Sequence, residues 1–169
     1  MIVGGRAAAL LFVSDGQINF LAPSELPEGT TQLTVSTPAG ASAPVTVAVV
    51  AVSPGIFFDA ATRFGAILFS GTAARTAERP ARAGEFIEIY ATGLGAVRAA
   101  ASGLRETVAA PRVTVGGAEA KVLFSGLAPG YLGLYQVNAQ MPEGLSAGAQ
   151  PLVMTVNGAR SNEVLTGVR

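Results

Sequence analysis

The sequence predicts an all-β protein, a sandwich or a barrel, built from two related parts. Short apolar runs rich in Val, Ile, Leu, Phe and Thr are separated by Gly, Pro and Ser, which is typical of such folds. Several runs alternate: in "QLTVST", Leu33 and Val35 face one way while the polar residues around them face the other. In addition, two long segments resemble each other at a nearly constant spacing.

The apolar runs define the expected strands. They cover residues 8–13, 17–22, 31–37, 44–52, 65–69, 85–92, 112–115, 121–125, 134–140, 150–157 and 163–168. The Ala-rich stretches around Ala73 and Ala99 have some helical character, but the Gly, Ser and Pro residues near them favour loops. We therefore expect loops at both places.

The internal repeat begins with "VGGRAAALLFVS" at Val3 and "VGGAEAKVLFSG" at Val115, an offset of 112 residues. Further on, "GQINFLAPSELPEG" and "LYQVNAQMPEG" match at an offset of 119 residues. The difference is an insertion in the second copy, "LAPGYLG", at residues 127–133. The matched structural positions of this second part are Gln17, Asn19, Pro23, Gln136, Asn138 and Pro142. A series of matches at constant offset indicates an internal duplication.

The duplication is unequal in length. The second copy has a long segment before its "VGG" that supplies front strands, whereas only Met1 and Ile2 precede the first "VGG". We expect residues 1–52 to form a partial β-sandwich lacking its N-terminal strands, and residues 53–169 to form a complete one, with "AVSPGIFF" as the linker. A sandwich without its front strands exposes apolar surface and unpaired backbone, and invites pairing with another chain.

Composition excludes several classes of function. Lys plus Arg and Asp plus Glu each total 11, so no charge pattern indicates a nucleic acid partner. Cys and His are absent, which removes thiol and imidazole chemistry and the usual zinc ligands, and no metal or other cofactor is expected. No run approaches the roughly 20 apolar residues of a membrane helix, so no membrane insertion is expected. "MIVGGRAAALLFVSDG" does not resemble a signal peptide, so any export signal is expected outside this chain.

At "SPGIFF", "IYATGLGAV", "GLAPGYLGLYQVNAQMPEG" and "VNGARSNEVL" the chain resembles a family of uncharacterised bacterial domains found at the C-terminal ends of exported proteins. That family looks like tandem immunoglobulin-like modules of the IPT/TIG kind. The resemblance implies two immunoglobulin-like β-sandwiches, the first lacking its N-terminal strands, and an extracellular or cell-surface location. The resemblance implies no catalytic residues in this chain.

Candidate ligand-binding residues are Tyr131, Tyr135, Gln136 and Asn138. The tyrosines offer flat faces on which a sugar ring can stack, but they can equally close the end of the sandwich. The amides can form a polar binding stripe or can hydrogen-bond to the backbone of an adjoining loop. For catalysis the chain offers only Ser14 with Asp15, Lys121 and scattered glutamates, and Glu85 and Glu88 are expected on opposite faces of their strand.

We therefore expect a protein that is not an enzyme. The leading hypothesis is a structural or adhesive extracellular module, a filament or oligomer subunit whose first domain is completed by a strand from a neighbouring chain. Its expected partners are copies of itself or other surface proteins. The alternative is a carbohydrate-binding module of an exported enzyme or adhesin, with a polysaccharide as ligand.

Overall fold

The computed structural model describes all residues from Met1 to Arg169, and the fold is all-β, as the sequence predicts. Every pair of named strands is antiparallel. The chain forms two compact units, unit 1 (Met1–Ala51) and unit 2 (Val52–Arg169). The structure contains no helix long and apolar enough to cross a membrane. Each unit is described by itself below.

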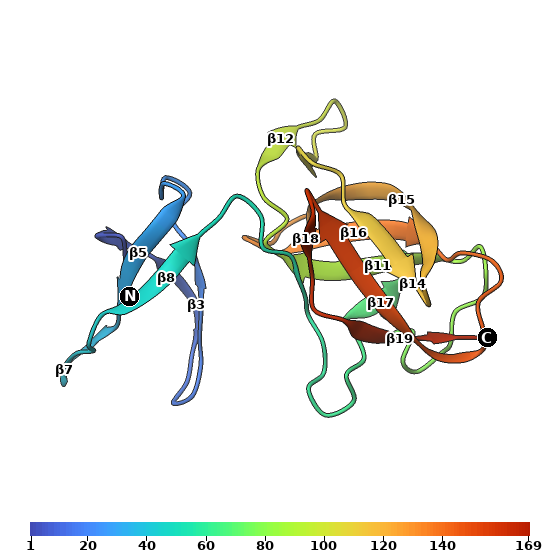
Figure 1. The fold of residues 1–169 in the computed structure, drawn as a ribbon, viewed down its shortest axis with the longest axis horizontal. Helices are drawn as coiled ribbons and strands as arrows, with labels where there is room; N and C mark the ends of the chain where they lie inside the picture. The colour runs from blue at the N-terminus through green and yellow to red at the C-terminus, as the bar shows by residue number, and fades with distance from the viewer. The chain divides into compact units, whose positions relative to one another are not determined.

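Unit 1 consists of short strands in three small sheets (Figure 1). Its strands are β1 (Ile2–Val3), β2 (Arg6–Ala7), β3 (Ala9–Val13), β4 (Ile18–Leu21), β5 (Gly29–Thr34), β6 (Ser36–Thr37), β7 (Gly40–Ala41) and β8 (Val45–Val49). The largest sheet has the order β2-β1-β5-β8, and the pairs β3-β4 and β6-β7 form the other two. Val3 is the one large apolar side chain of this unit that is fully buried.

Unit 2 has longer strands and one curled sheet. Its strands are β9 (Gly55–Ile56), β10 (Ile67–Phe69), β11 (Phe86–Thr92), β12 (Val97–Ala99), β13 (Arg105–Thr107), β14 (Arg112–Val115), β15 (Ala118–Leu127), β16 (Tyr135–Gln140), β17 (Gly148–Val156), β18 (Ala159–Arg160) and β19 (Val164–Val168). The main order is β10-β11-β16-β15-β14-β17-β18. In addition, β19 pairs with β17, β9 pairs with β11, and β13 pairs with β15.

The long strand β15 connects the two halves of this sheet. Its first residues pair with β14, and from Lys121 onward it pairs with β16, with a β-bulge between Val122 and Phe124. A bulge bends a strand and increases its twist, so the sheet curls and its apolar faces meet. Fully buried side chains from both halves fill the space between them: Ile67, Ile87, Ile89, Val113, Val115, Val137, Leu152, Met154 and Val164. Unit 2 is thus a sandwich-like unit with its own core.

The two copies of the repeat share their strand pairing. The pairing of β3 with β4 has the register and the bulge of the pairing of β15 with β16. The matching pairs are Leu10↔Phe20 with Val122↔Ala139, and Phe12↔Asn19 with Phe124↔Asn138. The pairing of β5 with β8 likewise matches that of β17 with β19 along its whole length. Residues 1–51 therefore repeat the arrangement of residues 113–169, strand by strand.

The "VGG" strings open both copies for the same conformational reason. Gly4 and Gly5 have φ values of 55° and 76°, and Gly116 and Gly117 have values of 55° and 85°. A two-residue turn with positive φ at both positions matches the twist of a β-hairpin, and glycine adopts these angles without strain.

The predicted strands are all present, with ends shifted by a few residues. The structure adds short strands that the sequence did not predict: β1, β2, β7, β9, β12, β13 and β18. The stretch around Ala99, expected as a loop, contains β12, which pairs with β13. The units divide between Ala51 and Val52, one residue before the boundary expected from the linker.

Candidate functional site: the open edge and apolar surface of unit 1

The strand β4 has an unpaired edge. Its counterpart β16 lies between two neighbours, β15 on one side and β11 on the other. In unit 1, β4 pairs with β3 alone, and residues 1–51 contain no strand equivalent to β11. One row of backbone N–H and C=O groups on β4 is thus free to pair with a further strand.

The hairpin of β3 and β4 carries an apolar inner face beside this edge. Leu10 lies opposite Phe20, and Val13 lies opposite Ile18, so these four side chains point to the same side. Leu10 and Val13 are 48% and 59% exposed. The unit 2 counterparts of the two β4 residues, Val137 and Ala139, are completely buried. Ile18 and Phe20 themselves are half-buried within residues 1–51, where no strand lies on the outer side of β4.

Other positions of unit 1 show the same contrast. Val45 on β8 is 56% exposed, whereas Val164, the same residue type at the equivalent position of β19, is completely buried. The large apolar side chains exposed in unit 1 are Ile2, Leu10, Leu11, Phe12, Val13, Leu21, Val45 and Val50. Such a concentration on a small unit is typical of a surface that binds another polypeptide.

The predicted amide pairs lie at corresponding positions at the start of β4 and in β16, with Gln17 directly before β4, but their partners differ from those expected. Gln17 Nε2 donates to Asn19 Oδ1 at 2.6 Å, and Gln136 Nε2 donates to Asn138 Oδ1 at 2.8 Å. Each pair is therefore closed on itself, and the expected hydrogen bonds to loop backbone are replaced by a side-chain bond along the strand. Pro23 and Pro142 each follow the end of their strand by two residues, where they end the pairing.

The two candidate tyrosines, one in the insertion and one just after it, have different environments. Tyr131 is 65% exposed in the loop between β15 and β16, next to Leu132, which is 71% exposed. Tyr135 is half-buried, and its phenol donates a hydrogen bond to the carbonyl of Gly95. Burial raises the pKa of the Tyr135 phenol. Tyr135 thus fastens a loop to β16, and only Tyr131 is free to contact a ligand.

A polar stripe crosses the outer face of unit 2. Glu88 and Tyr90 on β11 lie opposite Asn138 and Gln136 on β16. The Tyr90 hydroxyl donates to Glu88 Oε2 at 3.2 Å, and burial together with the Glu88 charge raises the pKa of Tyr90. The sequence interpretation missed Tyr90, because its pairing with Gln136 joins segments far apart in the chain.

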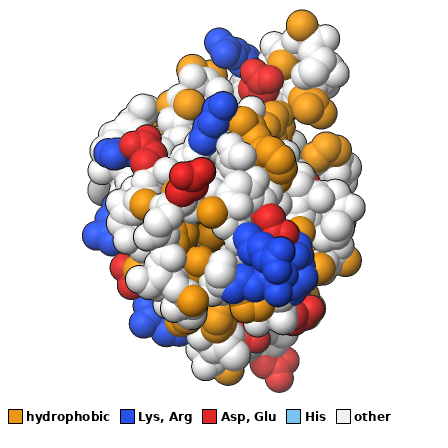
Figure 2. All heavy atoms as spheres, turned by 90° about the vertical axis from the view of Figure 1, so that its right-hand side faces the viewer, with side chains coloured by type: hydrophobic (Ala, Val, Ile, Leu, Met, Phe, Trp, Pro, Cys, Tyr) orange, Lys and Arg blue, Asp and Glu red, His pale blue; other side chains and the backbone are white.

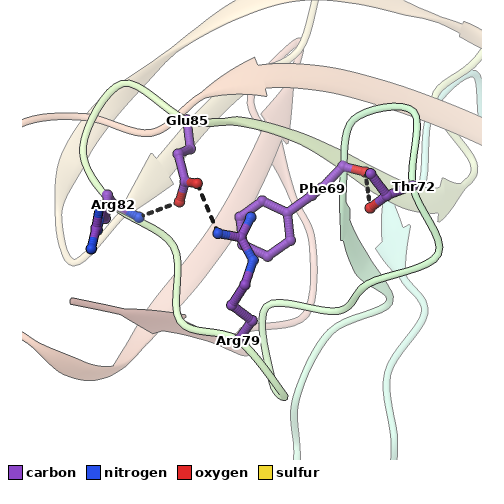
Figure 3. Close-up of polar contacts among 5 residues, drawn as sticks. All are labelled: Phe69, Thr72, Arg79, Arg82 and Glu85. Atoms are coloured by element: carbon purple, nitrogen blue, oxygen red, sulfur yellow. Dashed lines mark hydrogen bonds and ion pairs between the residues drawn. The ribbon is translucent and has the colours of Figure 1, made fainter.

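Glu85 takes part in a structural cluster (Figure 3). Its Oε2 accepts the backbone N–H of Arg82 at 2.7 Å, and its Oε1 accepts from Arg79 at 2.9 Å. The Arg79 guanidinium lies over the ring of Phe69, 3.4 Å from its centroid. The Arg82 N–H holds the pKa of Glu85 below its usual value, with help from Arg79. Glu85 is therefore an ionised carboxylate with fixed partners, and it is unsuited to donate a proton.

The remaining catalytic candidates are scattered. Lys121, Ser14 and Asp15 are exposed. Glu88 Oε1 accepts a hydrogen bond from the hydroxyl of Ser70 at 2.9 Å. The chain brings together no group of three His, Cys, Asp or Glu residues that could hold a metal ion. On the face drawn in Figure 2, basic side chains lie beside acidic ones, with hydrophobic side chains scattered between them.

Compared with models of protein families, with curated proteins and with solved structures, the chain has no match.

Proposed function

We propose that this chain is a non-catalytic structural or adhesive module whose unit 1 is completed by a strand from a neighbouring chain. The observation that carries the proposal is the exposure in unit 1 of positions that are fully buried in unit 2, Val45 and Val164 above all. Burying apolar surface stabilises a complex by about 25 cal/mol per Å², so this exposed surface favours association. The unpaired edge of β4 favours a partner segment in extended conformation, because only such a segment can pair with the backbone of a strand.

The resemblance to exported bacterial domains supports an extracellular or cell-surface location and immunoglobulin-like modules of the IPT/TIG kind. The engaged state of Glu85 and the exposure of Lys121 support a role other than catalysis. In this view the partners are copies of the chain or other surface proteins, and assembly into oligomers or filaments is the function.

Light scattering across a range of protein concentrations, together with negative-stain imaging, tests this proposal. Ordered oligomers or filaments support it. A monomer at every concentration, with the amides of unit 1 fully protected from hydrogen exchange, contradicts it, because a closed unit has no need of a partner.

The alternative is a carbohydrate-binding module, and one observation favours it. Tyr131 is exposed beside Leu132, and the polar stripe of Glu88, Gln136 and Asn138 lies on the outer face of the same unit. An exposed tyrosine offers a sugar a flat face, and a polar stripe offers it hydrogen bonds. Binding to a glycan array that is lost in Tyr131→Ala and retained in Leu132→Ala supports this alternative, and the absence of signal across polysaccharides contradicts it.

A further inference from the structure

The two β-hairpins of the repeat, β3-β4 and β15-β16, differ on the faces that point inward. Each inward-facing residue of β3 and β4 has a counterpart of a different type in unit 2. The pairs are Leu10 with Val122, Val13 with Ser125, Ile18 with Val137, and Phe20 with Ala139. Packing of the interior therefore does not require the two hairpins to have the same residues.

The residues that the hairpins share lie on their exposed sides. They are Leu11 and Leu123, Phe12 and Phe124, Gln17 and Gln136, and Asn19 and Asn138, and none of them is buried. The next outward-facing cross-strand pair differs again: Ala9 with Leu21 in unit 1 corresponds to Lys121 with Gln140 in unit 2. Exposed positions are free to vary unless they contact something, so identical aromatic and amide residues at such positions indicate a binding surface. We call each set of four residues the hairpin patch of its unit.

The members of a hairpin patch lie close together. In both copies the phenylalanine is the cross-strand partner of the asparagine, which places their Cβ atoms about 4.5 to 5.5 Å apart. In unit 2, a Cβ on Gly126 would lie 2.7 Å from Phe124 Cζ, and Gly126 is the cross-strand partner of Gln136. The Phe124 ring therefore extends along β15 beside both amides. The leucine lies at the β-bulge, with Leu11 53% and Leu123 51% exposed.

Each amide pair keeps hydrogen-bonding groups for a ligand. The bond from the glutamine Nε2 to the asparagine Oδ1 uses one donor of the glutamine and the acceptor atom of the asparagine. The asparagine Nδ2 still has its two N–H donors, and the glutamine Oε1 is still an acceptor. A hydroxyl group both donates and accepts, so two neighbouring hydroxyls can accept from the asparagine and donate to the glutamine.

The charges around the patches indicate an uncharged ligand. None of the residues in either patch is ionisable, and Lys121, two residues before Leu123, corresponds to Ala9 in unit 1. A ligand that binds at both patches therefore cannot depend on a charge. It needs a flat apolar face for the phenylalanine ring and hydroxyl groups at its edge for the amides, and a pyranose sugar has both.

We infer that each hairpin patch binds a sugar unit of a neutral polysaccharide, so that the chain has two sugar sites of the same kind, one in each unit. This inference rests on the carbohydrate-binding alternative above and moves its site from the loop of Tyr131 to the hairpins. The phenylalanine stacks on the sugar ring, the leucine extends the apolar surface, and the amides bind neighbouring hydroxyls. The site does not depend on what covers the β4 edge, because its side chains are on the outer face of the sheet.

NMR spectra of the complete chain test the two sites separately. The side-chain NH2 signals of Asn19 and Asn138 each report one unit, and the probes are short neutral oligosaccharides of glucose, mannose, galactose or N-acetylglucosamine. A sugar that binds should shift both signals. Phe12→Ala should weaken binding at Asn19 alone by about tenfold or more, because the stacking surface is lost, and Phe124→Ala should do the same at Asn138 alone.

Asn19→Asp tests the hydrogen bonds, because aspartate keeps the shape of the side chain and lacks the Nδ2 donors. Binding in unit 1, followed by the side-chain signal of Gln17, should weaken by about tenfold, and binding in unit 2 should stay unchanged. Phe86→Ala is the matched control, since Phe86 is 49% exposed on the outer face of β11 and belongs to neither patch. Equal losses in Phe86→Ala and Phe124→Ala would overturn the assignment to the shared residues.

Three other results would also overturn the inference. The first is that none of these sugars shifts either signal. The second is a response of Asn138 alone that Tyr131→Ala abolishes and Phe124→Ala retains, which places the sugar at the loop and leaves the carbohydrate-binding alternative intact. The third is a shift of both signals when the concentration of the chain alone is raised, because the patches are then covered by protein. Light scattering measures assembly independently of the sugars, so the proposed strand completion can hold or fail separately.

Discussion

Val164 and Val45 provide a matched test of whether unit 1 is open. They are the same residue type at equivalent positions, and their exposed fractions are 0% and 56%. Replacing a buried valine by alanine removes two methyl groups, which costs about 1.6 kcal/mol of transfer free energy at ~0.8 kcal/mol each. The cavity left behind adds to this, so Val164→Ala should destabilise unit 2 by roughly 2 to 3 kcal/mol. Val45→Ala should lose less than half of the transfer term and leave no cavity, about 0.7 kcal/mol at most.

The assay must follow each unit separately. All three tyrosines lie in unit 2, so tyrosine fluorescence during urea unfolding reports the free energy of unfolding of that unit. Amide hydrogen exchange of β5 and β8 reports unit 1. If Val45→Ala lowers the protection of unit 1 by as much as Val164→Ala lowers the stability of unit 2, then Val45 belongs to a closed core. The inference that unit 1 is incomplete would then be refuted.

Three further substitutions test contacts within unit 2. Gly167→Ala should cost about 1 to 3 kcal/mol, because its Cβ would meet the Thr76 carbonyl oxygen at 2.3 Å; an unchanged urea midpoint would contradict the close approach. Asn162→Ala should cost roughly 1 to 3 kcal/mol and speed hydrogen exchange in β9, since two hydrogen bonds to that strand are lost. The Arg82 N–H lowers the pKa of Glu85 below its ordinary value of 4.5 in the folded state, so the ionised form stabilises the fold at neutral pH. Glu85→Gln should therefore lower the urea midpoint at pH 7, and this difference should disappear as the pH falls through the folded-state pKa; a difference independent of pH would contradict the assignment.

The sequence predicted the strands whose signal is local. The strand predicted at residues 112–115 matches β14, and "QLTVST" extends over the end of β5 and the whole of β6, with Val35 between the two strands. The short strands β9, β12 and β13 were missed because two or three residues carry no periodicity. Arg105–Thr107 is polar enough to suggest a loop, and it becomes a strand only because β12 and β15 lie beside it. Such elements are determined by their neighbours in space, which a single sequence does not reveal.

The candidate site was predicted in part. The unequal lengths of the two copies agree with the absence of a β11 equivalent from residues 1–51, and the run "ALLFV" on β3 is a second local sign of exposed apolar surface. Five consecutive apolar residues on a strand leave both faces apolar, so one face must find a cover or remain exposed. The hydrogen bond from Tyr135 to Gly95 and the Arg79 contact with Phe69 were beyond prediction, because they depend on side-chain placement after folding.

The differences between the two copies follow the contacts that each residue makes. Ser161 bonds within the repeated part, since its hydroxyl accepts from Met154 N–H at 3.0 Å, and the equivalent Ser42 accepts from Val35 N–H at the same distance. The very next residue, Asn162, bonds to β9 outside the repeated part, and its equivalent is Ala43. Adjacent positions thus keep or lose their side-chain chemistry according to whether their partner lies inside the repeat. Unit 1 has the residues that hold its own strands together, and it lacks the side-chain contacts that hold residues 52–111 in unit 2.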